Sequence, residues 1–218
     1  MNEASPLAKA RTSGPRLDLI EEVIALPGRE LAIVRPRSTD LLLDEEAFEA
    51  EEFLPYWAEP WPSGLALARA VARMSLRWQR VVELGCGLAL PSLAAAHAGA
   101  RVLATDWSPD AVSLAGLNAR RNGVELETAL LDWARPAGVE YRFDLVLAAD
   151  VLYEHRNVEL LLGLLPRLVD GQGLALLADP GRPHAKTFLE RAHESWAIET
   201  TADALVPSVA IHRLRPRA

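Results

Sequence analysis

The sequence predicts a doubly wound α/β fold, in which a mostly parallel sheet carries helices on both faces. From about residue 80 onward, short apolar runs alternate with helix-like segments, and this alternation is typical of βαβ units. The clearest unit runs from Arg80 to Asp106, as a strand, a glycine turn, a helix and a second strand ending on an acid. With 218 residues, 50% of them hydrophobic, the chain suits one domain with a real core.

We expect residues 17–218 to form a single domain after a flexible tail. Residues 1–16 are small and polar without periodicity, which is typical of a mobile terminus. Residues 17–62 would form an N-terminal β-hairpin that turns at Pro27 and Gly28, followed by an aromatic strap. Residues 63–218 would then form the α/β core.

The aromatic strap holds Tyr56, Trp57 and Trp61 among three prolines. Proline restricts the backbone, so these rings could be held as a wall over a flat or cationic ligand. Packing against the core is an equally open alternative for Tyr56 and Trp57. Ser63 follows the strap and is a candidate N-cap for the first core helix.

The remaining elements follow from apolar patterning and capping signals. Helices are expected over about residues 64–77, 88–98, 109–122, 157–168 and 185–195. Strands are expected over about residues 81–84, 101–105, 124–131, 143–149, 174–178, 197–200 and 205–214. In a sheet of this kind, the ligand binds beyond the carboxyl ends of the strands.

Composition excludes several classes of protein. The formal net charge of −7 argues against a general nucleic-acid binder, although a local basic patch remains possible. Cys86 is the single cysteine, so an internal disulfide is impossible and a reducing compartment such as the cytoplasm is favoured. The five histidines lack metal-ligand spacing, and no apolar run is long enough to span a membrane, so we expect neither a metal site nor a membrane anchor.

The glycine turn after the first core strand is the main candidate for ligand binding. Gly85 and Gly87 would let a ligand approach the backbone, and Asp106 follows Gly85 by 21 positions, the separation at which an acid meets ribose hydroxyls. Leu90 replaces the third glycine that a pyrophosphate cradle prefers. Glu83 would repel phosphates and attract a cation. The expected ligand is therefore a nucleoside with positive charge.

From about Trp61 to its C-terminus, the chain resembles the seven-stranded S-adenosylmethionine-dependent methyltransferases. The matching stretch is Glu83-Leu84-Gly85-Cys86-Gly87, followed by Asp106 at the end of the next strand. The resemblance implies a Rossmann-like, seven-stranded, mostly parallel sheet with S-adenosylmethionine as cofactor. It implies that Asp106 takes the ribose hydroxyls and that Asp132, beside Trp133, takes the adenine amino group. The implied cofactor-binding residues are Trp61, Glu83, Gly85, Gly87, Asp106, Trp107, Asp132, Trp133 and Ala149.

Three further motifs resemble the lysine protein methyltransferase branch of that fold. Asp150-Val151-Leu152-Tyr153 is similar to its D-x-x-Y/F motif, and Trp61-Pro62 to its W-P element. The D-P-G-R-P turn at residues 179–183 resembles that of electron-transfer-flavoprotein β-subunit lysine methyltransferases. The resemblance implies that Asp150 orients an incoming ammonium group and that Tyr153 completes its pocket. The implied partner is a protein lysine, or a small amine, since bacterial chains of this kind are often labelled nicotinamide methylases.

Alternatives remain open for individual residues and for the function. Asp106 and Asp132 could end strands or cap helices, and Asp150 and Tyr153 could be structural. Cys86 is expected to pack rather than react. Arg182 could clamp a substrate carboxylate or tie down its loop. The alternative functions are a small-amine methyltransferase, a non-catalytic cofactor-binding module and, more remotely, an NAD(P)-dependent oxidoreductase.

Overall fold

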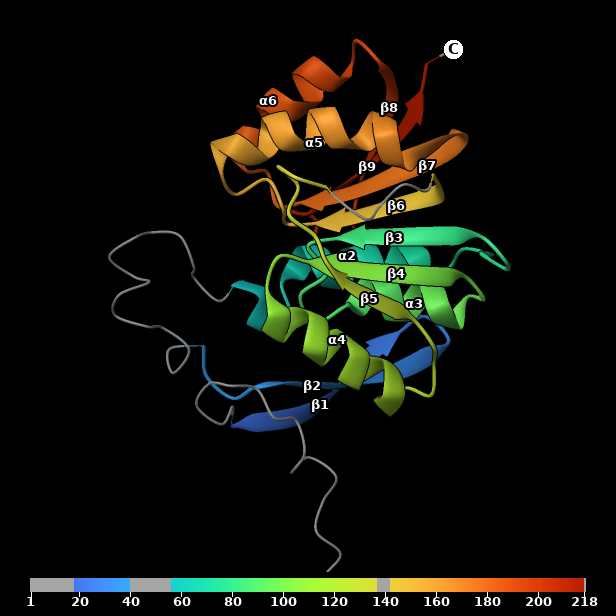
Figure 1. Cartoon of the computed structure of the whole chain (residues 1–218), viewed down its shortest axis with the longest axis vertical. Helices are drawn as coiled ribbons and strands as arrows, with labels where there is room; N and C mark the ends of the chain where they lie inside the picture. Colours follow the sequence, from blue (N-terminus) through green and yellow to red (C-terminus); the bar gives the residue numbers. More distant parts are fainter. Residues whose placement is uncertain (1–17, 40–55, 137–141, 218) are drawn as a thin grey trace, which may run out of the picture.

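The computed structural model describes residues 18–39, 56–136 and 142–217. It contains a seven-stranded sheet in the order β5-β4-β3-β6-β7-β9-β8 and a separate two-stranded hairpin of β1 and β2 (Figure 1). The predicted doubly wound α/β fold with an N-terminal hairpin is therefore confirmed. The predicted tail and residues 54–55 of the strap lie outside the described residues. Within the described ranges, none of the helices combines the length and apolar character needed to cross a membrane.

The elements alternate along the chain as the sequence predicts. The strands are β1 (Leu19–Leu26), β2 (Arg29–Pro36), β3 (Arg80–Leu84), β4 (Arg101–Asp106), β5 (Glu127–Leu130), β6 (Phe143–Ala149), β7 (Val169–Asp179), β8 (Trp196–Ala202) and β9 (Ala210–Pro216). The helices are the short 3₁₀ turn η3 (Tyr56–Ala58), α2 (Pro62–Val71), α3 (Leu90–His97), α4 (Pro109–Arg121), α5 (His155–Leu168) and α6 (Pro183–Ala192).

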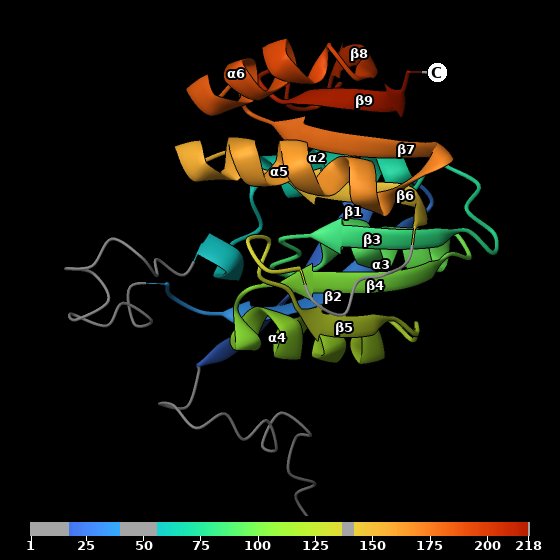
Figure 2. The same ribbon diagram turned by 45° about the horizontal axis from the view of Figure 1, so that its top comes forward.

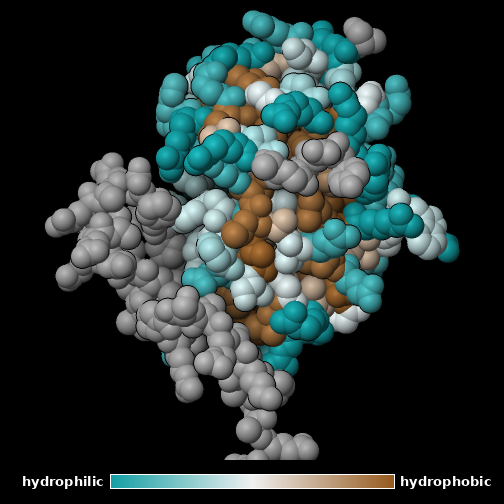
Figure 3. All heavy atoms as spheres, viewed as in Figure 1, coloured by the Kyte–Doolittle hydropathy of each residue, from teal (hydrophilic) through white to brown (hydrophobic). Residues whose placement is uncertain are grey.

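Two helical layers bury the sheet from opposite sides. Apolar residues of α2 and α3 form one core cluster with β3, β6 and β7, and residues of α5 and α6 form the other (Figure 2). Neighbouring strand residues point to opposite clusters: Val81 and Leu145 to the first, Val82 and Val146 to the second. Because both faces are covered there, these strands read as continuous apolar runs. In Figure 3, hydrophobic side chains are visible over the sheet between α5 and α4, with hydrophilic side chains around them.

The strand order places a crevice between β3 and β6. From β3 the chain builds outward through β4 to β5, and from β6 it builds in the other direction to β7. These five strands are parallel, whereas β9 runs antiparallel to both β7 and β8. In doubly wound sheets, ligands bind at this reversal, beyond the carboxyl ends of the strands.

The first core helix differs from its prediction at both ends. Helix α2 begins at Pro62 and ends at Val71, and its N-cap residue is Trp61. The prediction that Ser63 caps this helix is wrong, because a proline at the first helical position already fits the helical backbone and starts the helix earlier. Ser63 is instead fully buried, with its hydroxyl 3.5 Å from Oδ2 of Asp150.

Asn118 of α4 and Asn122, the C-cap of that helix, attach the hairpin to the core. The Ala32 amide donates to Oδ1 of Asn122 at 2.9 Å, and Nδ2 of Asn122 donates back to the Ala32 carbonyl at 2.8 Å. The Val34 amide donates to Oδ1 of Asn118 at 2.8 Å. The buried Asn118 also donates to the carbonyl of Leu88, just after the glycine turn, at 3.2 Å. These asparagines thus provide hydrogen-bond partners for the backbone groups at the inner edge of β2. Asn118 also links this strand to the ligand-binding end of the sheet.

We predict that Asn122→Ala lowers the free energy of unfolding by about 1–3 kcal/mol, because both backbone groups of Ala32 lose their partner. Urea denaturation measures this loss, and hydrogen exchange at the Ala32 amide should accelerate. Arg120→Ala is the matched control, since Arg120 is an exposed residue on the same helix. Equal stability of the two variants would contradict the prediction.

Candidate functional site

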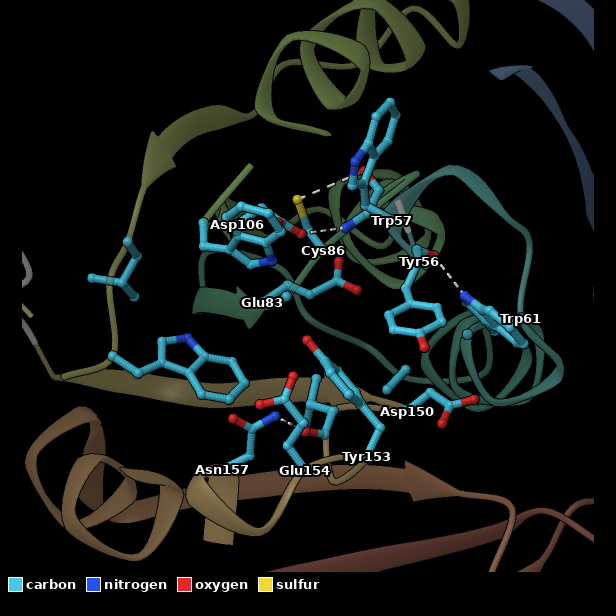
Figure 4. Close-up of a pocket in the computed structure, with 18 of the residues that line it drawn as sticks. Tyr56, Trp57, Trp61, Glu83, Cys86, Asp106, Asp150, Tyr153, Glu154 and Asn157 are labelled. Carbon is cyan, nitrogen blue, oxygen red and sulfur yellow. Dashed lines mark hydrogen bonds between the residues drawn. The ribbon is translucent and has the colours of Figure 1, made fainter. Parts of the chain in front are cut away.

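A cavity of about 600 Å³ opens at the carboxyl ends of β3, β4 and β6 (Figure 4). All of the residues predicted from the sequence to bind cofactor or to act in catalysis lie in its wall: Trp61, Glu83, Gly85, Gly87, Asp106, Trp107, Asp132, Trp133, Ala149, Asp150 and Tyr153. Residues from five separate segments therefore meet at one place. The contact that each would make with a ligand stays a prediction.

The glycine turn has a backbone that other residues adopt at a cost. Gly85 and Gly87 have φ values of +67° and +49°, in the left-handed region. A Cβ on Gly87 would lie 2.9 Å from the carbonyl oxygen of Trp57, and one on Gly85 would lie 3.1 Å from Cγ1 of Val151. The strap thus passes directly over the turn, and the glycines are needed for this packing as well as for ligand approach.

Asp106 ends β4 and holds the glycine turn. Its Oδ2 accepts from the Gly87 amide and its Oδ1 from the Ser108 amide, both at 2.9 Å. Burial raises the pKa of this carboxyl group, and the backbone hydrogen bonds oppose that rise. Each carboxylate oxygen can accept a second hydrogen bond, so the contacts to the turn leave capacity for ligand hydroxyls.

Glu83 is a buried carboxyl group in the floor of the cavity. Its Oε2 accepts from the Ser92 amide at 2.9 Å, in the first turn of α3. Burial raises the pKa of Glu83 to about 8, so without a ligand the group is mostly protonated at neutral pH. A cation placed beside it would favour the charged form. This agrees with the prediction of a positively charged ligand.

Asp132 lies at another part of the cavity wall, beside Trp133. Its Oδ1 accepts from the Ala134 amide at 2.9 Å, and its Oδ2 lies 3.3 Å from Nε of Arg135. The carboxylate therefore stabilises a turn after β5. The predicted adenine contact would have to use its remaining acceptor capacity.

Three aromatic side chains stand together at the mouth of the cavity. The ring centroids of Tyr56 and Tyr153 are 5.4 Å apart, and those of Tyr56 and Trp61 are 6.2 Å apart (Figure 4). Nε1 of Trp61 donates to the Tyr56 carbonyl at 2.6 Å and so fixes the strap. Tyr56 is 44% exposed and Trp61 37% exposed, so this wall also faces solvent. The strap thus contributes to the cavity, as one of the two alternatives from the sequence proposes.

Asp150 lines the cavity, but its carboxylate contacts Arg182 and Ser63. Its Oδ1 accepts from Nε of Arg182 at 2.5 Å, and its Oδ2 receives the long contact from Ser63. In Figure 4 its carboxylate points away from Tyr153. Its φ of +60° is unusual for a non-glycine residue. Arg182 therefore ties the D-P-G-R-P turn to the D-x-x-Y motif, one of the two roles that the sequence leaves open for it.

Sequence reasoning missed several polar residues of the wall. Glu154 forms an ion pair with Arg156 at 2.5 Å, and Nδ2 of Asn157 donates to the carbonyl of Val151 at 2.7 Å. Their position directly after the D-x-x-Y motif was the available signal. The acids in the wall are Glu59, Glu83, Asp106, Asp132, Asp150 and Glu154, and the arginines are Arg135 and Arg156. The excess of acids suits a cationic ligand.

Cys86 also lies in the wall, but its environment is apolar. It packs with Ala89, Ala104 and Ala115, and burial raises the pKa of its thiol. A raised pKa disfavours the reactive thiolate, so packing is the role that its surroundings support.

Comparisons with known proteins identify the relatives of the chain. Residues 58–195 match the family described as lysine methyltransferase. The chain is 34% identical over 137 residues to the electron transfer flavoprotein beta subunit lysine methyltransferase of Xenopus laevis, a match covering 59% of this chain and 53% of that protein. Its identity to the protein of the same name from Rattus norvegicus is 29% over 203 residues, covering 84% of this chain and 77% of that protein. The matches therefore span about half of the frog protein and about three quarters of the rat protein.

A solved structure shares the fold. The 16S rRNA methyltransferase of T. Thermophilus in complex with AdoMet and guanosine superposes with a TM-score of 0.66 and 17% identity, covering 95% of this chain and 53% of that chain. The resemblances predicted from the glycine turn and from the later motifs are confirmed by these matches.

We predict that Glu83 makes the ligand-free protein less stable as pH rises from about 5 to 8. Its pKa is higher in the folded state than the ordinary 4.5, so the folded state binds more protons across this window. The free energy of unfolding then falls with pH, by at most about 1.4 kcal/mol per unit. Glu83→Gln removes this dependence and can still accept from Ser92.

Urea denaturation at several pH values provides the comparison. Glu125→Gln is the control, because Glu125 is exposed and outside the cavity. If the free energy of unfolding depends on pH in the same way in the wild type and in Glu83→Gln, then Glu83 does not cause the predicted loss of stability at higher pH.

Proposed function

The chain belongs to the lysine methyltransferase family, which it matches over residues 58–195, and from this premise we propose that it transfers a methyl group from S-adenosylmethionine to the ε-amine of a protein lysine. The observation that carries this proposal is the acid-rich cavity at the reversal of strand order, where the predicted cofactor residues adjoin an aromatic mouth. Its volume of about 600 Å³ lies in the range of small-molecule sites. The single cysteine supports a cytoplasmic location.

The residues of the cavity fit a sulfonium nucleoside. Asp106 would accept from the ribose hydroxyls, the amides of the glycine turn would border the amino-acid part, and Asp132 with Trp133 would hold the adenine. Glu83 supplies a negative charge when a cation favours its ionised form. Trp61, Trp107 and Ala149 would complete the walls.

The bound cofactor supplies an electrophilic methyl group on a positively charged sulfur. The protein must align the acceptor amine with this methyl at about 3–3.5 Å and keep the amine neutral, because a free lysine has a pKa near 10.4. Tyr56, Trp61 and Tyr153 would exclude water and face the amine with their rings. Burial raises the pKa of Tyr153, which keeps its phenol neutral and able to donate a hydrogen bond.

Asp150 is our candidate for holding the incoming ammonium group before it loses its proton. Arg182 occupies Oδ1, but Oδ2 makes only a long contact with Ser63 among the described residues. Oδ2 could therefore exchange that contact for the ammonium group. A protein acceptor is favoured over a small amine because the aromatic mouth is partly exposed rather than closed.

Incubation of the purified protein with radiolabelled S-adenosylmethionine and cell extract tests the function. Label on lysine in a protein is the expected result. Label in a small amine would establish the alternative small-molecule activity instead. Cofactor binding without transfer to any acceptor would support the non-catalytic module, and binding of NAD alone would overturn methyl transfer altogether.

We predict that Asp106→Asn weakens S-adenosylmethionine binding by about tenfold or more. The amide oxygen can still accept from Gly87, but the Ser108 amide loses its acceptor. The charge-assisted hydrogen bonds to the ribose, worth about 1.5–3 kcal/mol, are lost as well. Isothermal titration calorimetry measures the affinity, with Glu125→Gln as the charge-matched control. An unchanged dissociation constant would remove Asp106 from the binding site.

We predict that Asp150→Asn lowers kcat/KM for the protein acceptor about 10- to 100-fold, while cofactor affinity changes less than about threefold. Arg182→Gln separates the two roles of Asp150, since it removes only the partner of Oδ1. A direct role on the acceptor requires Arg182→Gln to be clearly more active than Asp150→Asn in steady-state assays. If both variants lose the same amount of kcat/KM and the double variant loses no more, then Asp150 acts only by holding Arg182.

A further inference from the structure

A strained and exposed tryptophan lies at the end of the sheet opposite to the cavity. Trp78 belongs to the turn between α2 and β3. Figure 1 shows this turn at the amino end of β3. It is 67% exposed and has a φ of +68°, a left-handed backbone that bulky residues rarely adopt. The exposed side chain therefore gains little stabilisation from burial, and the left-handed backbone of this residue costs free energy. Outliers of this kind point to a function outside folding.

The turn that carries Trp78 is held rigidly. The Trp78 amide donates to the carbonyl of Gly99 at 3.0 Å, and the Arg101 amide donates to the carbonyl of Gln79 at 2.8 Å. The Leu76 amide adds a bond to Ala98 at 3.3 Å. The turn is thus fastened to the segment between α3 and β4. A surface preorganised in this way loses little entropy when it binds a partner.

Arginines surround the exposed ring. The guanidinium carbons of Arg77 and Arg101 lie 5.5 Å and 5.9 Å from its centroid, within the range of cation–π contacts. Such a contact uses the face of a guanidinium and leaves its N–H groups free to donate in the plane. Neither arginine forms an ion pair with any acid in the part of the chain that the structure describes.

Strand β9 adds two more arginines to the same place. Arg213 and Arg215 are two positions apart on β9, so they point to the same side of the strand. Together with Arg77 and Trp78 they line a hollow of about 380 Å³. Asp144, the acid in its lining, is already bound to Arg80, whose amide donates to it at 2.7 Å. The hollow therefore keeps an excess of positive charge on a chain whose net charge is −7.

We propose that this surface, the Trp78 face made of Arg77, Trp78, Arg101, Arg213 and Arg215, docks an extended acidic segment of a protein partner. Carboxylates match the planar donors of arginine and can accept two parallel hydrogen bonds from each. The local basic patch that the composition left open is thus present and has a defined shape. Docking here leaves the cavity free, because the two sites lie at opposite ends of the strands. The inference does not depend on methyl transfer.

An acidic protein segment fits this surface better than a nucleic acid. A long polyanion would extend past the arginines and meet a surface of negative net charge. The ring of Trp78 is also engaged by two guanidinium groups, whereas binding of single strands relies on aromatic faces available to bases. A short acidic segment needs only the arginines.

Fluorescence anisotropy of the full chain with a labelled decaglutamate peptide tests the proposal at low salt. We expect Arg213→Ser/Arg215→Ser to weaken binding about tenfold or more and to reduce its salt dependence. The control is Arg37→Ser/Lys186→Ser, which removes the same charge from exposed positions outside the hollow, after β2 and near the N-terminus of α6, and should change binding less than about twofold. Oligouridylate of the same length and inorganic phosphate serve as competitors.

Trp78→Gly supplies a second variant that should fold, because glycine accepts the positive φ without strain. It should also weaken peptide binding, since the ring that positions Arg77 and Arg101 is lost. Equal affinity of the wild type and Arg213→Ser/Arg215→Ser would overturn the proposal. So would an equal loss in the control variant, tighter binding of oligouridylate, or displacement of the peptide by an equal concentration of phosphate.

Discussion

The hydrogen bond from the Gly87 amide to the Asp106 carboxylate is the contact on which the ligand-binding end of the fold depends. The parallel register places Leu84 beside Thr105, so β3 and β4 end at the same level. The Thr105 hydroxyl donates to the carbonyl of Glu83 at 2.6 Å, and Asp106 then reaches across to the glycine turn. A buried carboxylate is stable there because backbone amides satisfy it. The residue expected to bind the ribose therefore also shapes the turn that borders it.

The acids of the cavity are stabilised in two different ways. Asp150 is neutralised within the chain by Arg182, which joins the ends of β6 and β7. Glu83 has no cationic partner among the described residues, and burial raises its pKa instead. Asp106 lies between these cases, since backbone amides offset part of its burial. The part of the cavity near Glu83 therefore gains most from a bound cation, whereas a cation at Asp150 has only Oδ2 available to it.

The sequence predicts the features that depend on neighbours along the chain. Apolar runs that end in glycine or an acid identify the strands and the wall of the cavity, because parallel strands bring their carboxyl ends together. The sequence does not predict contacts between segments that are far apart along the chain. The hydrogen bonds of Asn118 and Asn122 to β2 join residues about ninety positions apart, and asparagine near a helix end is usually a capping signal. The side to which Asp150 points is equally hidden, because Arg182 and Ser63 come from separate elements.

The opposite charges at the two ends of the sheet follow the direction of the helices. In this topology the helices run antiparallel to the strands, so their N-termini lie at the cavity and their C-termini at the Trp78 face. Helix N-termini carry partial positive charge and stabilise nearby acids, as the Ser92 amide of α3 does for Glu83. Helix C-termini favour cations within about one turn, and Arg101 begins β4 four residues after the last residue of α3. The partial positive charge of these helix N-termini also repels a cationic ligand. A cavity that binds a cation therefore needs several acids rather than a single carboxylate. The wall of this cavity contains six acids.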